Sequence, residues 1–180
     1  MILAEAPDRD RVRTPSPPML QSLAPVAGPA TRLLVLGSFP GAASLAAGQY
    51  YAHPRNHFWP ILSAIWQVDL QALGYPRRLT LLRERGLGVW DVYAGCRRAG
   101  SLDQAIEDAE YNDFGALVRR LPRLAGVAHN GGESARAMRY LAALGLPVQR
   151  LPSTSPANAS WSFDRKLAAW RAAFAAHGIA

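Results

Sequence analysis

The chain has 180 residues, with 20 Lys and Arg side chains against 13 Asp and Glu, a net charge of +7 and a pI near 10.3. This length suits one domain with a substantial core, and no apolar run is long enough to span a membrane. The N-terminus lacks a basic start followed by an apolar stretch, so we expect no secretion signal. Cys96 is the single cysteine, which excludes an internal disulfide and favours a cytoplasmic protein of bacterial type.

The positive charge is carried almost entirely by arginine, since Lys166 is the only lysine. Arginine binds phosphate through two parallel hydrogen bonds, and neutralised phosphates release counterions. The charge therefore favours a nucleic-acid partner. Compositional drift in an alanine-rich and arginine-rich chain is the alternative.

The first 30 residues contain six prolines among small and polar residues. This composition predicts a flexible N-terminal tail over residues 1–30, followed by one folded domain over residues 31–180.

Four short apolar segments, each closed by Gly, Pro or polar residues, are typical of strands buried on both faces of a parallel sheet. They span residues 32–37, 86–93, 124–129 and 147–152. Helical patterns are expected over residues 57–68, 76–85, 112–121, 132–144 and 160–176. In the last of these, Phe163, Leu167, Trp170 and Phe174 form a stripe that predicts core packing. Right-handed crossovers then give an α/β fold, a three-layer α/β/α sandwich around a central, mainly parallel four-stranded sheet.

Polar loops follow the predicted strands, at the ends where an open α/β sheet binds its ligands. The carboxyl ends of parallel strands meet at one edge, so we expect these loops to form one site. The loops begin at Gly37 after the first strand, near Asp91 at the end of the second, at His129 and Asn130 after the third, and at Leu151 after the fourth.

Neither a nucleotide-binding loop nor a metal site is predicted. The turn at residues 37–41 has neither the GK[ST] ending of a Walker loop nor the G-x-G-x-x-G spacing of a dinucleotide site. His53 and His57 are four residues apart, but Pro54 interrupts a helix through both and the glutamate of an H-E-x-x-H motif is absent. We therefore expect no metal and no cofactor.

Several polar residues have simpler structural interpretations. Asn56 stands where a helix cap would be useful, and Asn158 could cap the last helix or bend the loop before it. Ser153 and Ser155 could satisfy local backbone groups or bind phosphates.

Three segments in this order resemble the uracil-DNA glycosylase superfamily, and most closely its hypoxanthine (deoxyinosine) DNA glycosylase branch. They are GSFPG at 37–41, AHPRNHFW at 52–59 and LPSTSP at 151–156. The similarity extends from about residue 30 to residue 176. It implies a catalytic domain that flips a deaminated base out of double-stranded DNA and hydrolyses its N-glycosidic bond.

The resemblance also implies roles for individual residues. Much of the superfamily has an Asp or Asn that orients the attacking water where this chain has Phe39, and in the hypoxanthine branch this catalytic role passes to Asn56. An amide is a poor base, so Asn56 would position water and stabilise an oxocarbenium-like sugar. The base-binding residues would be Phe39, Tyr51 and Asp91, the pocket backbone would come from Gly37, Ser38, Pro40, Gly41 and His53, and the DNA-contacting loop would contain Ser153, Thr154, Ser155 and Asn158.

The second motif often begins with His in the superfamily, whereas this chain has Leu151, which favours hypoxanthine over uracil. We expect a monofunctional, monomeric DNA-deoxyinosine glycosylase that leaves an abasic site. The alternatives are a uracil, mismatch-specific or broad-range glycosylase of the same fold, a non-catalytic DNA-binding module, and a hydrolase of free nucleosides.

Overall fold

The computed structural model describes residues 17–180, and its centre is a four-stranded parallel sheet in the order β3-β2-β6-β7. The side chains of β2 are completely buried, as expected for a strand covered on both faces. The predicted sheet is therefore confirmed. Its strands are β2 (Leu33–Gly37), β3 (Leu87–Asp91), β6 (Gly126–Asn130) and β7 (Val148–Leu151).

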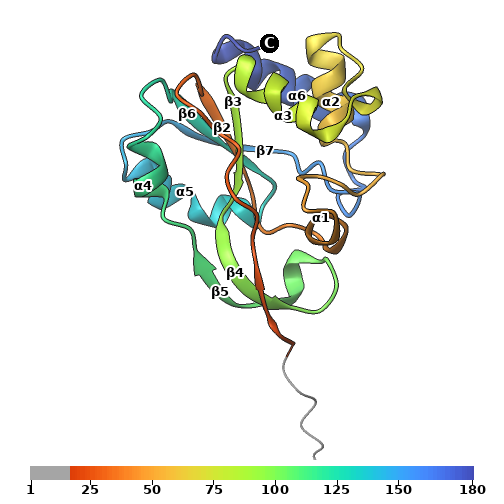
Figure 1. Ribbon diagram of the computed structural model, residues 1–180, viewed down its shortest axis with the longest axis vertical. Helices are drawn as coiled ribbons and strands as arrows, with labels where there is room; N and C mark the ends of the chain where they lie inside the picture. Colours follow the sequence, from red (N-terminus) through yellow and green to blue (C-terminus); the bar gives the residue numbers. More distant parts are fainter. Residues whose placement is uncertain (1–16) are drawn as a thin grey trace, which may run out of the picture.

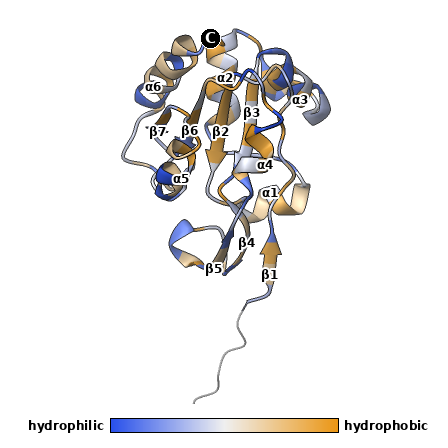
Figure 2. Cartoon of the chain, turned by 90° about the vertical axis from the view of Figure 1, so that its left-hand side faces the viewer, coloured by the Kyte–Doolittle hydropathy of each residue, from blue (hydrophilic) through white to orange (hydrophobic). Residues whose placement is uncertain are grey.

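Helices cover both faces of this sheet, which confirms the three-layer sandwich. Figure 1 shows α2 (Phe58–Trp66), α3 (Tyr75–Glu84) and α6 (Phe163–Ala176) on one side of the sheet. The shorter α4 (Phe114–Val118) and α5 (Met138–Ala142) lie on the other. Figure 2 shows hydrophobic residues concentrated on the strands between these layers. In residues 17–180, no helix is long and apolar enough to cross a membrane.

The aromatic stripe of α6 packs into the core as predicted. Trp170 and Phe174 are completely buried. Their rings meet Phe58 and Trp66 of α2, at centroid distances of 5.8 and 6.0 Å. Because each buried aromatic side chain contributes roughly 1.5–3 kcal/mol, this contact fixes α2, and with it the loop that precedes α2, against the rest of the fold.

A second sheet, which the sequence did not predict, extends from the end of β3. It is antiparallel, in the order β1-β4-β5, with β1 at Met19–Gln21, β4 at Tyr93–Arg98 and β5 at Ile106–Tyr111. Only Val92 separates β3 from β4, and its N–H donates to the Gly37 carbonyl at 2.8 Å. The predicted strand over residues 86–93 is therefore wrong at its end, because the chain passes there from one sheet into the other.

The expectation of a flexible tail up to residue 30 is wrong for residues 17–30. β1 pairs with the edge of β4, and Val26 exchanges two backbone hydrogen bonds with Val89 at 2.8 and 2.9 Å. Val26 is buried in the core, and this burial outweighs the proline-rich composition that suggested a tail. Residues 1–16 of the expected tail lie outside the described residues.

Three predicted boundaries also change. The long loop after β2 contains a helix, α1 (Ala42–Ala47). The predicted helix over 132–144 consists of a 3₁₀ turn, η3 (Ser134–Ala137), followed by α5, and the helix over 112–121 shortens to α4. Two further 3₁₀ turns are η1 (Leu70–Ala72) and η2 (Asp103–Ala105).

Candidate active site

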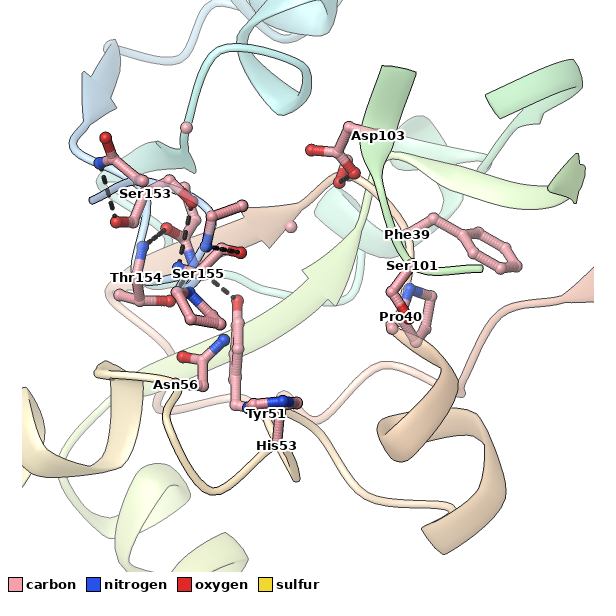
Figure 3. A pocket seen from close by; sticks show the side chains of 18 of the residues that line it. Phe39, Pro40, Tyr51, His53, Asn56, Ser101, Asp103, Ser153, Thr154 and Ser155 are labelled. Carbon is pink, nitrogen blue, oxygen red and sulfur yellow. Dashed lines mark hydrogen bonds between the residues drawn. The ribbon is translucent and has the colours of Figure 1, made fainter. Parts of the chain in front are cut away.

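A cleft of about 700 Å³ opens at the carboxyl ends of the parallel strands (Figure 3). This volume lies within the range of small-molecule sites. The structure brings all the predicted site residues to this cleft, as the convergence of strand ends required. They are Gly37, Ser38, Phe39, Pro40, Gly41, Tyr51, His53, Asn56, Asp91, Ser153, Thr154, Ser155 and Asn158.

The floor of the cleft is formed where β2 and β3 end side by side. Gly37 pairs with Asp91, and a Cβ atom on Gly37 would lie 2.6 Å from Asp91 Oδ1. Only glycine therefore allows the carboxyl group to sit there. Asp91 is 3% exposed, and its Oδ2 accepts a hydrogen bond from the Ser22 hydroxyl at 3.0 Å.

Burial raises the pKa of the Asp91 carboxyl to about 7. The hydrogen bond from Ser22 opposes this rise, as does the charge of Arg98, whereas the charge of Asp103 adds to it. A carboxyl group with this pKa is present in both protonation states near neutral pH. It can therefore donate a hydrogen bond as well as accept one.

Tyr51 places an aromatic ring beside this floor by adopting an unusual backbone conformation. Its φ angle is +55°, in the left-handed region, which costs a non-glycine residue roughly 1–2 kcal/mol. One face of its ring stacks on Phe58, with centroids 3.9 Å apart and planes 19° apart. Tyr51 also lines the cleft, where a flat ring could stack on the ring face opposite Phe58.

Asn56 lies at the end of a turn in which its N–H donates to the His53 carbonyl at 2.9 Å. Its Oδ1 accepts the N–H of Phe58, the first residue of α2, also at 2.9 Å. Asn56 therefore braces the start of the helix, as its structural interpretation suggested, and also lines the cleft. Among residues 17–180 its Nδ2 has no hydrogen-bond partner, so this amide group and one lone pair of Oδ1 can bind a water molecule.

Asn130, at the end of β6, holds the loop after β7 in place. Its Oδ1 accepts from the Thr154 N–H and its Nδ2 donates to Thr154 Oγ1, both at 2.9 Å. Thr154 is completely buried, so its side chain anchors the loop. Contact between this loop and DNA stays a prediction. From the sequence, Asn130 was expected in a tight turn and as a weaker candidate for ligand contact, and its anchoring of the loop was not predicted.

Hydrogen bonds from neighbouring residues hold the backbone of the loop over residues 152–158 in place. Four consecutive carbonyl groups accept hydrogen bonds from protein donors, so the loop presents mainly donors, such as the Ser153 and Ser155 hydroxyls, to the cleft. The donors are Trp170 Nε1 to Pro152 (3.0 Å), Asn158 Nδ2 to Ser153 (3.1 Å), His57 N–H to Thr154 (3.0 Å) and Lys166 Nζ to Ser155 (3.5 Å).

The alternatives for this loop are also resolved. Asn158 bends the loop through Ser153 and does not cap α6, whose cap is Ser162. Ser153 Oγ accepts from the Ser155 N–H, and Ser155 Oγ accepts from the Ala157 N–H, both at 3.2 Å. The serine oxygens therefore satisfy local backbone, and the hydroxyl hydrogens remain able to donate.

The opposite wall comes from the loop over residues 99–105, between β4 and β5. Ser101 Oγ accepts the Ala42 N–H at 2.9 Å, and Ser38 Oγ donates to Asp103 Oδ1 at 2.7 Å. The sequence missed this wall because it missed the second sheet. The Gly100-Ser101 pair between two short strands was the only available signal for a hairpin here.

Comparisons with known proteins agree with this architecture. Residues 25–175 match the Uracil DNA glycosylase superfamily. This chain belongs to that superfamily. A protein named hypoxanthine DNA glycosylase from Methanosarcina barkeri (strain Fusaro) is 39% identical over 154 residues, which are 86% of this chain and 97% of the relative. One of the same name from Methanosarcina acetivorans is 35% identical over 80% of this chain and 90% of its own length.

A solution NMR structure from Methanosarcina acetivorans, described as that of a candidate uracil DNA glycosylase, has a TM-score of 0.80 and 32% identity. The match covers 89% of this chain and 99% of that structure. The predicted family and fold are thus confirmed.

One residue predicted to bind the base has a partner within this protein. The Phe39 ring lies under the Arg98 guanidinium, 5.1 Å from ring centroid to Cζ, and Figure 3 shows it directed away from Tyr51 and Asn56. The ring is thus engaged by Arg98, and base binding by Phe39 stays a prediction. Phe39 forms part of the pocket through its backbone.

The two histidines of the segment over residues 52–59 are engaged separately. His53 Nδ1 accepts the Arg55 N–H at 3.1 Å, and His57 packs edge-on against Phe163, with ring centroids 5.4 Å apart. Within residues 17–180, no three His, Cys, Asp or Glu side chains come together as metal ligands.

Proposed function

We propose that this protein is a DNA glycosylase that removes hypoxanthine from deoxyinosine in double-stranded DNA. The observation that carries the proposal is a cleft that combines a carboxyl group, a free ring face and an unpaired amide. These features belong to Asp91, Tyr51 and Asn56, in a chain related over most of its length to proteins named hypoxanthine DNA glycosylase.

A glycosylase of this kind extrudes the damaged nucleotide, because the glycosidic carbon is shielded inside the base stack. The extruded base would stack on the open face of Tyr51. The loop over residues 152–158 would meet the DNA backbone, because its hydroxyl groups can donate to phosphate oxygens and its carbonyls between Pro152 and Ser155 are already paired.

Asp91 would recognise the Watson–Crick edge of the base. Hypoxanthine presents an O6 acceptor beside an N1–H donor. A protonated carboxyl group can donate to O6 and accept from N1–H at the same time, and the raised pKa keeps part of the Asp91 population protonated near pH 7. The ionised form would accept from N1–H but repel O6.

Asn56 would hold the attacking water. Its Oδ1 keeps one lone pair for a water hydrogen, while the Phe58 N–H fixes the plane of the amide. The amide is not a base strong enough to remove a proton. Its contribution would be position and stabilisation of positive charge on the sugar.

The reaction would stop at an abasic site. The only lysine, Lys166, is 1% exposed behind the loop and does not line the cleft. Within residues 17–180, no side-chain amine therefore lines the cleft to form the Schiff base that strand cleavage requires.

Uracil is the second candidate substrate, because it has the same carbonyl and N–H pair as hypoxanthine and one structural relative was described as a candidate uracil DNA glycosylase. Single-turnover assays with labelled duplexes carrying one hypoxanthine, uracil, xanthine or mismatched thymine distinguish the two. We expect alkali-labile product first and fastest from hypoxanthine. Absence of abasic product from every duplex would reject the enzyme and leave a DNA-binding module, whereas cleavage of free inosine alone would indicate a nucleoside hydrolase.

A further inference from the structure

The loop over residues 99–105 brings a second carboxyl group to the cleft, and the mechanism above leaves it unused. Asp103 lies at the start of η2, on the wall formed by the second sheet. The Arg98 side chain fastens this loop to the first motif, because it donates to the carbonyls of both Gly100 and Pro40. Asp103 is therefore held at a defined place.

The two carboxyl oxygens of Asp103 differ in their partners. Oδ1 accepts the Ser38 hydroxyl at 2.7 Å, and among residues 17–180 Oδ2 has no hydrogen-bond partner. Although Asp103 is exposed on one side, partial burial of its carboxyl raises the pKa, and the charge of Glu133 acts in the same direction. The Ser38 hydrogen bond and Arg98 oppose this rise. A protonated Asp103 would thus accept through Oδ1 and donate through Oδ2.

As leaving groups in glycosidic bond cleavage, purines differ from uracil in having one additional basic atom. A purine has N7, whose lone pair can take a proton. Protonation there lets the base leave as a neutral molecule instead of an N9 anion. Asp91 is assigned to the Watson–Crick edge of the base, so protonation of N7 requires a second proton donor.

We propose that Asp103 is the general acid that protonates N7 of the departing hypoxanthine, an inference that rests on the proposed function. The Asp103 Oδ2 proton moves to N7 as the bond between C1′ and N9 breaks, and the bonding pair stays with the purine. Water adds to C1′ through its oxygen and releases one proton to solvent. Asp103, which is exposed at the open side of the cleft, regains a proton from solvent.

The positions of the two groups suit this division of roles. Figure 3 shows Asp103 and Asn56 on opposite sides of the cleft, on different elements. Displacement at the sugar requires the water and the leaving base on opposite faces of C1′. A water held by Asn56 and an acid at Asp103 satisfy this requirement.

Asp103→Asn is the informative variant, because an amide oxygen can still accept the Ser38 hydrogen bond while the acid is lost. Asp108→Asn is the matched control, since Asp108 lies on the same hairpin, outside the cleft, and pairs with Arg97. Single-turnover rates would be measured on duplexes containing deoxyinosine, its 7-deaza analogue and its N7-methyl analogue. In the last of these, the methyl group supplies the positive charge that protonation would create.

On deoxyinosine we expect Asp103→Asn to be about 100-fold slower than wild type, and Asp108→Asn to equal wild type. On the N7-methyl duplex, after correction for spontaneous depurination, we expect Asp103→Asn to match wild type. On the 7-deaza duplex, wild type should fall to the rate of Asp103→Asn or below it.

Three results would overturn the assignment of Asp103. They are an Asp103→Asn rate within threefold of wild type on deoxyinosine, an equal defect on deoxyinosine and its N7-methyl form, or wild-type cleavage of the 7-deaza duplex within tenfold of deoxyinosine. Inactivity of the wild type on deoxyinosine would instead reject the proposed function itself.

Discussion

The loops over residues 99–105 and 152–158 form opposite walls of one cleft, but they are supported differently (Figure 3). In the loop over residues 152–158, four consecutive carbonyl groups accept hydrogen bonds from His57, from two side chains of α6 and from Asn158 of the loop itself. The serine hydroxyls are left as donors toward the cleft. The loop over residues 99–105 is held through side chains at Ser101 and Asp103, and it presents a carboxyl group. When the backbone carbonyls of a loop are already hydrogen-bonded, the loop offers mainly donors to a nucleotide, whereas a loop with a carboxyl group offers an acceptor or an acid. Donors suit phosphate, and a carboxyl suits a base.

The strongest test of this division concerns Asn56, whose neighbour His57 donates its N–H to the Thr154 carbonyl of the loop over residues 152–158. Asn56→Ala should lower the single-turnover rate on deoxyinosine about 1,000-fold, because the water loses its position. Affinity for DNA with an abasic-site analogue should stay within threefold of wild type. Weakened binding with normal turnover at saturating DNA would assign Asn56 to structure alone.

A second test concerns the raised pKa of Asp91, which lies at the floor of the cleft. The ordinary pKa of Asp91 is 3.8, and in the folded protein it is about 7. Between these values the unfolded chain releases a proton that the folded chain keeps, so the free energy of unfolding should fall as pH rises through this window. The fall is up to about 4 kcal/mol, at 1.36 kcal/mol per unit of pKa.

Asp91→Asn should remove this fall, so urea unfolding of the variant and the wild type between pH 4 and 8 measures the effect. The variant should gain stability relative to wild type as pH rises. Parallel stability curves for the two proteins would contradict a raised pKa at Asp91.

The hydrogen bonds that anchor the loop over residues 152–158 can be removed at Asn130. Asn130→Ala removes both hydrogen bonds to Thr154 and leaves its buried N–H unpaired, which should cost roughly 2–3 kcal/mol in urea unfolding. Thr154→Val keeps the N–H and the shape but loses the hydroxyl, so it should cost less. A larger loss for Thr154→Val would place the anchor elsewhere.

The smallest effect is expected at Lys166, whose charge lies behind the same loop. Lys166→Met should weaken binding of lesion-containing duplex about threefold to tenfold, or about 1 kcal/mol, without changing the preferred lesion. Arg171→Met removes an exposed charge from the same helix and is the matched control. Anisotropy titrations that show equal losses for both variants would attribute the effect to net charge.

The parallel sheet and the site loops could be predicted because their signals are local. Apolar runs closed by Gly or Pro mark the strands, and motif order marks the loops, including Asn56 and the residues from Ser153 to Asn158. The second sheet could not be predicted, because half of the residues of β5 are charged and β4 continues β3 after a single residue. The role of Thr154 depends on Asn130, which lies 24 positions away, and the ring of Phe39 turns to Arg98. Such pairings appear only when the chain is folded.

The direct passage from β3 into β4 has a mechanical consequence. Only Val92 separates the two hydrogen-bonded sheets, and its own N–H is paired, so we expect little bending between the sheets on this side of the cleft. If the protein acts on duplex DNA as proposed, adjustment during recognition would come from the DNA or from the outer loops. The frequency with which a weakened base pair opens by itself would then govern how quickly a lesion is captured.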